Sequence, residues 1–529
     1  MKSLSQSQMK RLTAVHGWSG MLLGLLLYAV VITGTVVVFA EEIAVWSVGG
    51  NRATAPLTSE LDSKVHAAAE SVTKGYREAI DVWSNARGEV LIFAHAHARN
   101  PDTGQMDDIG PLIRVDAESG EVLSRNDGFV WQRADWYDPS ALRHFLVDLH
   151  VQLSVPEPWG LILTGILGLA MMAAGVTGFI MHRHLLRDLF VAERPGKRLV
   201  SARDRHVLAA SWGLPFAFLL GFTGAFFSFA GTVALPLLAT IAFGGDQEAL
   251  VETLYEPAVQ TDPRPQPLAN LDAMIAESTG RAGAAPIFVS IGNFGRADSR
   301  VSIWHEPPAG SLYYVHNLFD GTGRFLEKRP AIGNEPSTAS FVYSLMGPLH
   351  FGNFAGILSK SVWVGLGAAM CFVILSGMQL WTRRREEERL WRGFARAVSV
   401  VGYGLPLAML ASAYAFFLSL PSADPFWWTP AGFLIAAALA IVFGCAVQDE
   451  RRLTLGFRRS LAVGCLALPL LRMAAGGTSW AEALGHGLGT VLAIDLVLAL
   501  LGAALLLWRV QESPRARNAA FRPLSEAAE

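Results

Sequence analysis

Four histidines occupy equivalent positions in an internal repeat of this chain. Each stands before a long apolar stretch, and the four are His16, His150, His206 and His350. Each stretch carries a hydroxyl-glycine pair near its far end, and these pairs are Thr33-Gly34, Thr177-Gly178, Thr223-Gly224 and Ser376-Gly377. Residues 16–182 and 206–381 therefore look like two copies of one unit. Ionisable side chains at membrane depth are rare and are functional-site candidates by default, and four in register form a stronger signal than one.

The chemistry that histidine brings to a membrane helix is metal ligation. A neutral imidazole is a good axial ligand for haem iron, and two imidazoles from facing helices can clamp one haem inside a bundle. If every apolar stretch spans the membrane, His16 and His206 share the inner depth, and His150 and His350 share the outer depth. Pairing across the membrane is excluded, because 18 helical residues rise about 27 Å. The pattern predicts two bis-histidine b-type haems with these four axial ligands, and filled iron positions favour electron transfer over oxygen binding.

The repeated glycines lie at the depths of the same two pairs. Gly34 and Gly224 are level with the outer histidines, and Gly178 and Gly377 are level with the inner ones. A porphyrin is a broad plate, and small residues let helix backbones approach closely. The glycines therefore either make room for each haem or serve plain helix packing, and both interpretations stay open.

Two further histidines are reserve ligands. His182 follows the second apolar stretch on the inner side, and His144 precedes it on the outer side. Neither has an equivalent in the second repeat, so each ranks behind the repeated four. A ligating imidazole also needs an acceptor for its second ring nitrogen, and no such acceptor is identified from the sequence.

Composition places the chain among membrane proteins. Of its 529 residues, 52% are hydrophobic and only 17% are charged, which is too apolar for an ordinary soluble domain. The formal net charge of −2 gives no electrostatic reason to expect nucleic acid as a partner. The three cysteines form no haem-attachment motif, so any haem is bound non-covalently. No nucleotide-binding fingerprint occurs, so electrons must come from a separate cytoplasmic donor, either a protein or quinol.

We expect an α-helical integral membrane protein with about eight transmembrane helices in the lipid bilayer. Basic residues gather between alternate spans, which predicts that both termini lie in the cytoplasm and that the two long outer segments face the periplasm if the cell is Gram-negative. The expected segments are the N-terminus with the first span (1–40), a first outer domain (41–145), the second span (146–184), a cytoplasmic loop (185–205), the third span (206–243), a second outer domain (244–349), the fourth span (350–382), another cytoplasmic loop (383–396), four additional spans (397–508) and a cytoplasmic tail (509–529).

The two outer segments are predicted to be small α+β domains in the periplasm. Each starts with a helical pattern and continues with β-rich runs that include a strand-turn-strand. Four histidines lie in these domains. His95 and His97 alternate on one expected strand and so share a face, while His305 and His316 belong to the second domain. They either touch a metal-bearing substrate or are ordinary strand residues.

The last four apolar stretches carry polar residues of their own. Glu482 and His486 are one helical turn apart on one face, and Asp495 lies deep in the eighth stretch. A buried carboxylate serves either as a proton relay or as a polar contact between helices. The helix contact is the preferred interpretation.

Taken together, these features resemble the PepSY-associated transmembrane family, the iron-regulated inner-membrane proteins of the PiuB and FoxB kind. The likeness rests on His16-Gly17-Trp18 before a span that closes on Thr33-Gly34, on an Asp-x-x-Ser/Thr-Gly-Glu-Val-Leu hairpin in the outer domain, and on Leu149-His150 and Leu349-His350-Phe351-Gly352 before later spans. It covers about residues 10–390. The resemblance implies a di-haem b membrane reductase that passes cytoplasmic electrons to a ferric siderophore in the periplasm and releases ferrous iron. The last four spans lie outside the family pattern.

Two haem-free alternatives stay open at this point. An internal repeat is compatible with a transporter, although transporters usually carry inverted repeats with interrupted helices and this repeat is parallel. Small outer domains of this type also occur in sensory or protease-regulating membrane proteins. Neither alternative explains four histidines in register, and haem content discriminates between the hypotheses.

Overall fold

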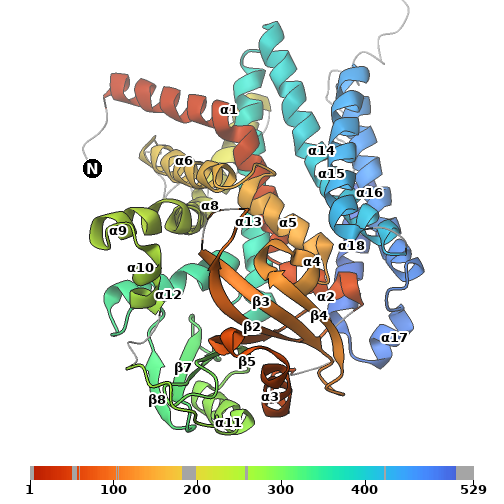
Figure 1. Ribbon diagram of the computed structural model, residues 1–529. Coiled ribbons are helices and arrows are strands. Elements are labelled where there is room, and N and C mark those ends of the chain that lie inside the picture. The colour runs from red at the N-terminus through yellow and green to blue at the C-terminus, as the bar shows by residue number, and fades with distance from the viewer. Residues whose placement is uncertain are drawn as a thin grey trace, which may run out of the picture.

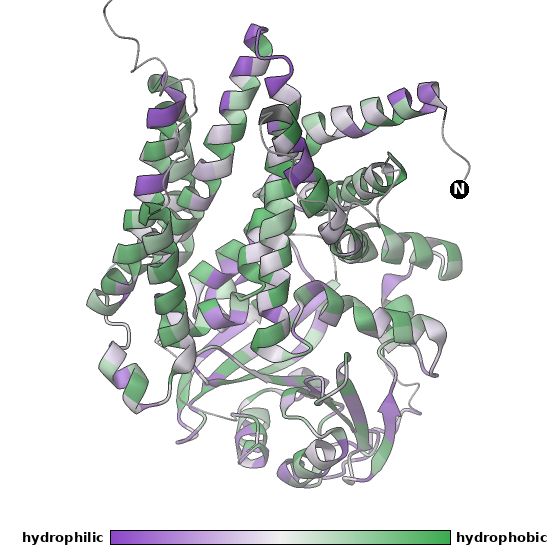
Figure 2. Ribbon diagram, turned by 180° about the vertical axis from the view of Figure 1, so that it is seen from behind, coloured by the Kyte–Doolittle hydropathy of each residue, from purple (hydrophilic) through white to green (hydrophobic). Residues whose placement is uncertain are grey.

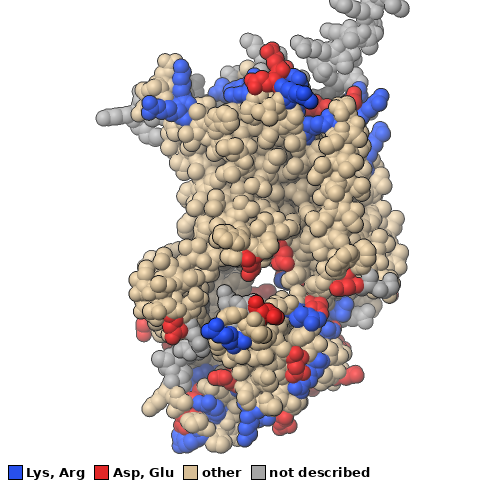
Figure 3. Space-filling model, turned by 45° about the horizontal axis from the view of Figure 1, so that its top comes forward, with Lys and Arg blue, Asp and Glu red and all other residues tan. Residues whose placement is uncertain are grey.

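The computed structural model of the chain describes residues 5–49, 56–58, 60–102, 104, 106–181, 198–255, 260–421 and 424–507. A bundle of long helices stands on a β-sheet (Figure 1). Apolar residues dominate the bundle, and polar residues gather in the sheet half and at the opposite ends of the helices (Figure 2). On the face shown in Figure 3, charged side chains also avoid a broad band of the bundle. This distribution is what a bilayer-spanning bundle requires.

Eight helical segments of the described chain are long and apolar enough to cross a membrane. They are α1 (Gln6–Val37), α6 (Trp159–Met181), the continuous run Val200–Ala242, α13 (Gly356–Arg383), α14 (Arg389–Ser419), α15 (Pro425–Ala446), α16 (Glu450–Ala474) and α18 (Gly489–Leu507). The continuous run combines α8 (Arg198–Phe229), the π-helical turn η3 (Ala230–Ala234) and α9 (Leu235–Ala242). The expected α-helical membrane architecture with about eight candidate spans is confirmed.

Polar caps fix the places where several of these helices start. Ser5 begins α1 with a capping box, in which its hydroxyl accepts from the backbone N–H of Gln8 and the Gln8 side chain accepts from the Ser5 N–H. Asp449 begins α16 by accepting from the backbone N–H of Arg452 at 2.7 Å. Each such cap contributes about 1 kcal/mol to the helix that it starts.

Short helices connect the bundle to the sheet or to its neighbours. They are α2 (Ala40–Val48), α4 (Ala134–Tyr137), α5 (Ala141–Gln152), α10 (Gln247–Tyr255), α12 (Thr338–Phe351) and α17 (Trp480–Gly485). His150 lies in the last turn of α5, and His350 lies in the last turn of α12. Neither histidine therefore begins a span, contrary to the expectation from the sequence.

In the expected segments 146–184 and 350–382, the helices that can span the membrane are α6 and α13, and a separate short helix, α5 or α12, precedes each of them. A residue with a left-handed backbone ends the first helix of each pair: Leu153 ends α5 (φ 53°) and Gly352 ends α12 (φ 68°). The spanning helices α6 and α13 start several residues later.

All strands of the described chain form one antiparallel sheet. They are β1 (Ala79–Ser84), β2 (Val90–Arg99), β3 (Met106–Val115), β4 (Val122–Phe129), β5 (Pro286–Gly292), β6 (Arg300–His305), β7 (Val315–Asp320) and β8 (Phe325–Arg329). Their order is β4-β3-β2-β1-β5-β6-β7-β8, so each outer segment supplies a four-stranded meander. The meanders join where β1 pairs with β5, with Ile80 opposite Ile291 and Val82 opposite Val289. The segments expected as two small domains are thus halves of one sheet.

The two halves of the sheet share one hydrophobic core. Helices α3 (Leu61–Ser71) and α11 (Leu271–Ala282) lie on the face of the sheet that points away from the bundle (Figure 1). Their apolar side chains pack with alternate strand residues in a single cluster that includes Val65, Ile92, Ile275 and Ile303. Because this core crosses the seam between β1 and β5, each half buries its apolar face only with the help of the other.

The two repeats of the bundle make matching contacts. Helix α1 of the first repeat packs on α13 of the second, and α6 of the first packs on α8 of the second. Glycines allow close crossings in both pairs. A Cβ atom on Gly168 would lie 2.7 Å from the carbonyl oxygen of Gly221, and one on Gly367 would overlap Thr35 Oγ1. The four repeated spans therefore form one interlocked unit.

A buried charge network attaches the last four spans to the rest of the chain. Asp495 of α18 accepts from Arg472 Nη2 of α16 at 2.7 Å, from Trp46 Nε1 of α2 at 2.7 Å and from Trp480 Nε1 of α17 at 2.8 Å. Arg472 is fully buried and also donates to the carbonyl oxygen of Thr478. With both carboxylate oxygens occupied by donors, Asp495 holds helices together, which favours the helix-contact interpretation over a proton relay.

Candidate functional site

His16 is held by the hydroxyl-glycine pair of a neighbouring helix. Its Nδ1 atom, on α1, lies 3.2 Å from the carbonyl oxygen of Ala174 and 3.2 Å from Thr177 Oγ1, both on α6. Because a carbonyl oxygen only accepts, Nδ1 carries the proton and Nε2 keeps its lone pair. The carbonyl and the hydroxyl therefore fix both the tautomer and the direction of the ring.

The other three repeated histidines have the same arrangement. The distances from Nδ1 to the hydroxyl oxygen are 3.0 Å for His206 and Ser376, 3.3 Å for His150 and Thr33, and 2.9 Å for His350 and Thr223. Backbone carbonyl oxygens of the same partner helices also face Nδ1 of His206 and of His150. Within the described residues, no hydrogen bond involves Nε2 of any of the four rings. Four imidazole lone pairs are therefore available to a ligand.

The glycine of each pair lies directly against an imidazole edge. A Cβ atom added to the glycine would stand at the following distances from the histidine Cε1: 2.7 Å for Gly34 and His150, 3.1 Å for Gly377 and His206, 3.4 Å for Gly224 and His350, and 3.5 Å for Gly178 and His16. We call each hydroxyl-glycine pair a cradle, because its hydroxyl holds Nδ1 and its glycine leaves space for the ring. Space for the histidine is a role that we did not predict for these glycines. Space for a haem stays a prediction.

The four histidines form two pairs. The ring centroids of His150 and His350 are 6.3 Å apart. His16 on α1 and His206 on α8 are each held by a helix that packs against the other histidine's helix, α6 against α8 and α13 against α1. These are the pairs that depth in the membrane predicts. Their role as haem ligands stays a prediction.

Each repeat builds its own cradles, whereas each pair joins the two repeats. His16 and His150 are held by helices of the first repeat, α6 and α1. His206 and His350 are held by helices of the second repeat, α13 and α8. Both pairs combine one ring from each repeat, so neither pair is complete in a single repeat.

The cradles predict a graded response to added methyl groups. We expect Gly34→Ala to displace the His150 ring, because the new Cβ would stand 2.7 Å from Cε1 and overpacking of this kind costs about 1–3 kcal/mol. Gly178→Ala is the matched control, because its Cβ would make an ordinary contact at 3.5 Å with His16. The measurement is the retention of any bound cofactor during purification, with a loss of about tenfold in affinity for Gly34→Ala. Equal retention in both variants would contradict the cradle geometry.

The reserve ligands do not enter the described pairs. His144 lies earlier in α5, where its Nε2 is 3.3 Å from Asp148 Oδ2 and its ring packs beside Phe426 of α15. His182 lies outside the described residues. The outer pair is therefore formed by the two repeated histidines alone among the described residues.

Two of the four sheet histidines have structural partners in the second half of the sheet. His305 is fully buried, with Nε2 2.6 Å from Ser278 Oγ and Nδ1 2.9 Å from the carbonyl oxygen of Ala284. His316 stacks on Trp304 with ring centroids 4.0 Å apart. Burial lowers the pKa of His316 to about 3, so the ring is neutral at physiological pH. Both side chains serve the packing of the sheet.

The first half of the sheet carries a cluster of histidines and carboxylates. His95 and His97 share one face of β2, as expected, and their ring centroids are 5.9 Å apart. Burial by itself lowers the pKa of His95, but the carboxylates of Asp108 and Asp81 outweigh it and raise the pKa to about 9. In the absence of a ligand, His95 is therefore the cation of a small ion-pair network.

Three tryptophans gather at the end of the bundle opposite the sheet. The ring of Trp18 lies 5.3 Å from Trp381 and 6.3 Å from Trp391, centroid to centroid. The guanidinium of Arg385 stands 3.8 Å above the Trp381 ring. Trp18 follows His16 closely in α1, so this aromatic and basic group lies at the end of the bundle where the inner pair is found.

The eight candidate spans, the duplicated helical unit and the sheet define a multi-pass membrane protein with paired imidazoles in its bundle. The chain belongs to the PepSY-associated TM region family, whose model matches residues 13–384. That range contains both repeats with all four cradles and ends before α14. The chain is also similar to an uncharacterised protein of Pseudomonas aeruginosa, with 28% identity over 384 residues, which cover 68% of this chain and 92% of that protein.

Proposed function

We propose that the protein is a membrane reductase that holds two b-type haems, one at each histidine pair, and delivers electrons to a ferric siderophore on the sheet side. The observation that carries this proposal is the set of four imidazoles whose Nδ1 is fixed by a cradle and whose Nε2 has no hydrogen bond within the described residues. Histidines that ligate metals are typically oriented in this way, by a hydrogen bond at their other nitrogen.

The residues present fit a haem. A transition metal lies about 2.0–2.1 Å from an imidazole nitrogen, and the 6.3 Å between the centroids of His150 and His350 leaves room for one ion between the rings. The chain offers no covalent attachment motif, so the paired imidazoles would hold a haem non-covalently.

When bound, the two haems supply one-electron transfer, since iron with two protein ligands has no position for oxygen. The residues of the chain determine where this happens. The cradles keep the proton of each imidazole on Nδ1, so Nε2 is unprotonated. The helices hold one histidine pair near the sheet and the other near the opposite end of the bundle. One electron converts one ferric ion to ferrous iron, so every ion released requires one electron from a donor at the opposite end.

We place the electron donor, a separate protein or quinol, at the end that carries Trp18, Trp381, Trp391 and Arg385. Aromatic rings and one guanidinium offer contact area and positive charge to either kind of donor. The sheet side then corresponds to the periplasm of a bacterial inner membrane, and both termini lie in the cytoplasm. This orientation agrees with the basic segments between alternate spans.

Reoxidation by a ferric chelate tests the proposal. The purified protein is reduced with dithionite without air, freed of excess reductant and mixed with a ferric siderophore in the presence of a ferrous-specific chelator. We expect the reduced haem spectrum to disappear while ferrous iron appears, one ion for each electron lost. The gallium complex of the same siderophore is the matched control, because it has the same charge and shape but accepts no electron.

The contrary outcomes are distinct from each other. A folded protein that contains no haem after expression with ample haem would overturn the proposal and direct attention to transport. A haem-containing protein that the ferric complex does not reoxidise faster than the gallium complex would exclude ferric siderophores as oxidants and leave only the haem assignment standing.

A further inference from the structure

Three ligand atoms converge on the sheet, far from the cradles in sequence. His95 Nδ1, His97 Nδ1 and Asp108 Oδ1 all lie within 4.8 Å of one another. Asp108 Oδ1 is 2.8 Å from His97 Nδ1 and 3.5 Å from His95 Nδ1. Two atoms that bind the same metal at about 2.1 Å are themselves about 3 Å apart. Asp108 Oδ1 therefore already stands at about the separation of a shared coordination shell from each imidazole nitrogen, and the two nitrogens lie within 4.8 Å of each other.

Strand register produces this convergence. His95 and His97 alternate on β2 and so project from the same face. Asp108 stands directly opposite His97 on β3, the closest cross-strand position available. Asp81 of the other neighbouring strand, β1, reaches His95 from the opposite side. Three adjacent strands thus supply the cluster, which gives it a rigid base.

The hydrogen bonding of His95 points to a missing ligand. Its Nε2 lies 3.2 Å from Asp81 Oδ2, so Nε2 donates to a carboxylate. Its Nδ1 is buried and makes no hydrogen bond, only a long ion-pair contact of 3.5 Å with Asp108 Oδ1, and His95 as a whole is only 4% exposed. A carboxylate that fixes one imidazole nitrogen and frees the other for the metal is the usual outer shell of a metal-binding histidine.

A hydrogen bond also orients the carboxylate of Asp108 toward the two histidines. Its Oδ2 accepts from Trp131 Nε1 at 2.8 Å, which leaves Oδ1 facing the two Nδ1 atoms. The side chain of His97 is 50% exposed, so an ion can enter from solvent. A second hydrogen bond or ion pair thus orients the side chains of His95 and Asp108, and the solvent-exposed side of His97 provides the entry path for the ion.

We propose that His95, His97 and Asp108 bind a divalent first-row transition metal ion through two imidazole nitrogens and one carboxylate oxygen. This donor set leaves coordination positions open for water, and two histidines with one carboxylate suit ferrous iron. The metal site follows from the sheet alone. Its assignment to ferrous iron rests on the proposed function, which would release that ion on this side of the membrane.

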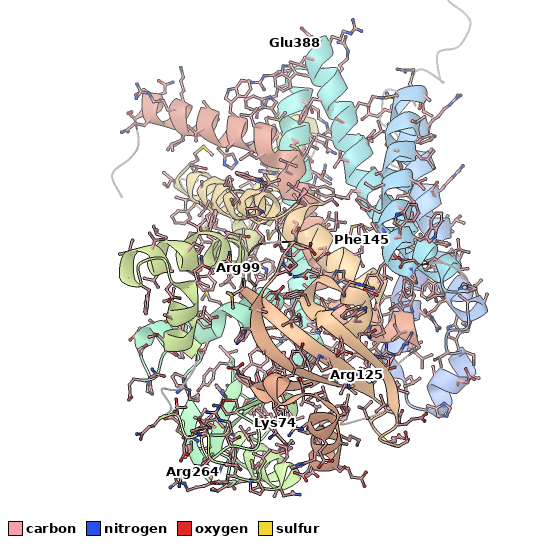
Figure 4. The ribbon with its side chains drawn as sticks, viewed as in Figure 1. Lys74, Arg99, Arg125, Phe145, Arg264 and Glu388 are labelled. Atoms are coloured by element: carbon pink, nitrogen blue, oxygen red, sulfur yellow. The ribbon has the colours of Figure 1, made fainter. Side chains whose placement is uncertain are left out.

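The cluster occupies the face of the sheet that points toward the bundle. Leu91 and Phe93, the preceding residues on this face of β2, pack with Val130 in a cluster separate from the core beneath α3 and α11. The chain continues from Val130 through α4 into α5, which carries His150. Arg99, at the end of β2, lies on the bundle side of the sheet (Figure 4). An ion held here is therefore on the side of the sheet that faces the outer histidine pair.

Metal counting on the full-length protein in detergent tests the site. Chelator-treated protein is dialysed against micromolar Zn²⁺ or Co²⁺, and the bound metal is counted by elemental analysis, a readout that haem iron does not disturb. We expect about one ion per chain, and affinities at least tenfold weaker for His97→Ala and Asp108→Asn. Asp81→Asn is expected to weaken binding about tenfold to a hundredfold, since it alters only the orientation of His95.

Two controls make the result specific. His66→Ala removes a partly exposed histidine of α3, on the other face of the sheet, where it lies 3.9 Å from the single carboxylate of Asp62, and it is expected to leave metal binding unchanged. Metal binding is also expected to be unchanged in His150→Ala, so failure of the haem proposal leaves this result intact. With Fe²⁺ as the probe, in the absence of air, the same variants are expected to lose binding.

The overturning result is equally plain. If folded wild-type protein binds no stoichiometric Zn²⁺ or Co²⁺, or if both His97→Ala and Asp108→Asn keep wild-type affinity, the cluster is an ion-pair network that stabilises the sheet. If Zn²⁺ and Co²⁺ bind at these residues but Fe²⁺ does not, the metal site stands and its assignment to ferrous iron falls.

Discussion

A His150→Ala protein is expected to retain about half of the wild-type haem, because one of two independent pairs loses a ligand. His350→Ala is expected to lose the same half, and combining the two substitutions adds no further loss, since both act at one site. His16→Ala or His206→Ala removes the other half. The measurement is a pyridine haemochrome assay of each purified variant, normalised to protein concentration and checked for monodispersity.

The neighbouring His144 provides the matched control for this experiment. It lies on the same short helix as His150 but pairs with Asp148, so His144→Ala is expected to keep the full haem content. Retention of all haem in the four ligand variants would contradict the assignment of the pairs. Complete loss in a folded single variant would show that the two sites are not independent.

Asp495→Ala is expected to destabilise the protein by about 3–5 kcal/mol, because it leaves the Arg472 guanidinium buried without a counter-charge. Arg472 is fully buried and Asp495 is 3% exposed, so water cannot replace the lost partner. The substitution also removes the acceptor of the indole N–H groups of Trp46 and Trp480, each of which then bears a desolvation cost. Thermal unfolding in detergent, followed by circular dichroism, measures the change.

A double variant separates charge from packing in this network. Arg472→Met combined with Asp495→Leu removes both charges at similar volume. It is expected to recover the part of the stability lost to the unpaired guanidinium, while both indole N–H groups stay without their acceptor. His486→Gln, an exposed substitution near α17, serves as the neutral control. Equal instability of the single and double variants would mean that the polar contacts to the tryptophans, rather than the ion pair, hold the helices.

The spans and the histidine pairs could be predicted from the sequence because both depend on properties that run along the chain. The length of an apolar segment shows whether its helix can cross a bilayer. The rise per residue of a helix converts the spacing of two residues in the sequence into their difference in depth within the membrane. The pairing of His16 with His206 followed from depth alone. Spacing does not give the direction of a side chain around its helix, so the contacts of the rings were not foreseen.

The acceptors of the histidine nitrogens were missed although their signal was visible. A hydroxyl residue precedes the glycine in every copy of the repeat, as in Thr33-Gly34 and Ser376-Gly377. A small residue for packing needs no hydroxyl beside it, so this regularity already indicated a hydrogen bond. The structure supplies the missing partner, since Thr33 reaches His150 and Ser376 reaches His206.

The joining of the two outer segments could not be predicted by the same reasoning. The alternation of Ala79–Ser84 is compatible with a strand, but alternation gives only the face that a strand buries and not its partner. The partner strand, Pro286–Gly292, follows about two hundred residues later. Such pairing depends on the helices that carry both segments to the same side of the bundle.

The seam between β1 and β5 gives a single polypeptide the symmetry of a homodimer. Antiparallel pairing of two equivalent strands is what an isologous two-fold interface makes, and the histidine pairs fall across the same division. Covalent linkage makes this contact intramolecular, so it forms at any cellular concentration of the protein. Linkage also permits divergence: a true homodimer would carry the cluster of His95, His97 and Asp108 twice, whereas in the described part of this chain only the first half of the sheet carries it. The two repeats thus keep two-fold pairing at the β1–β5 seam and at the histidine pairs, to which both repeats contribute. The cluster of His95, His97 and Asp108 belongs to the first repeat.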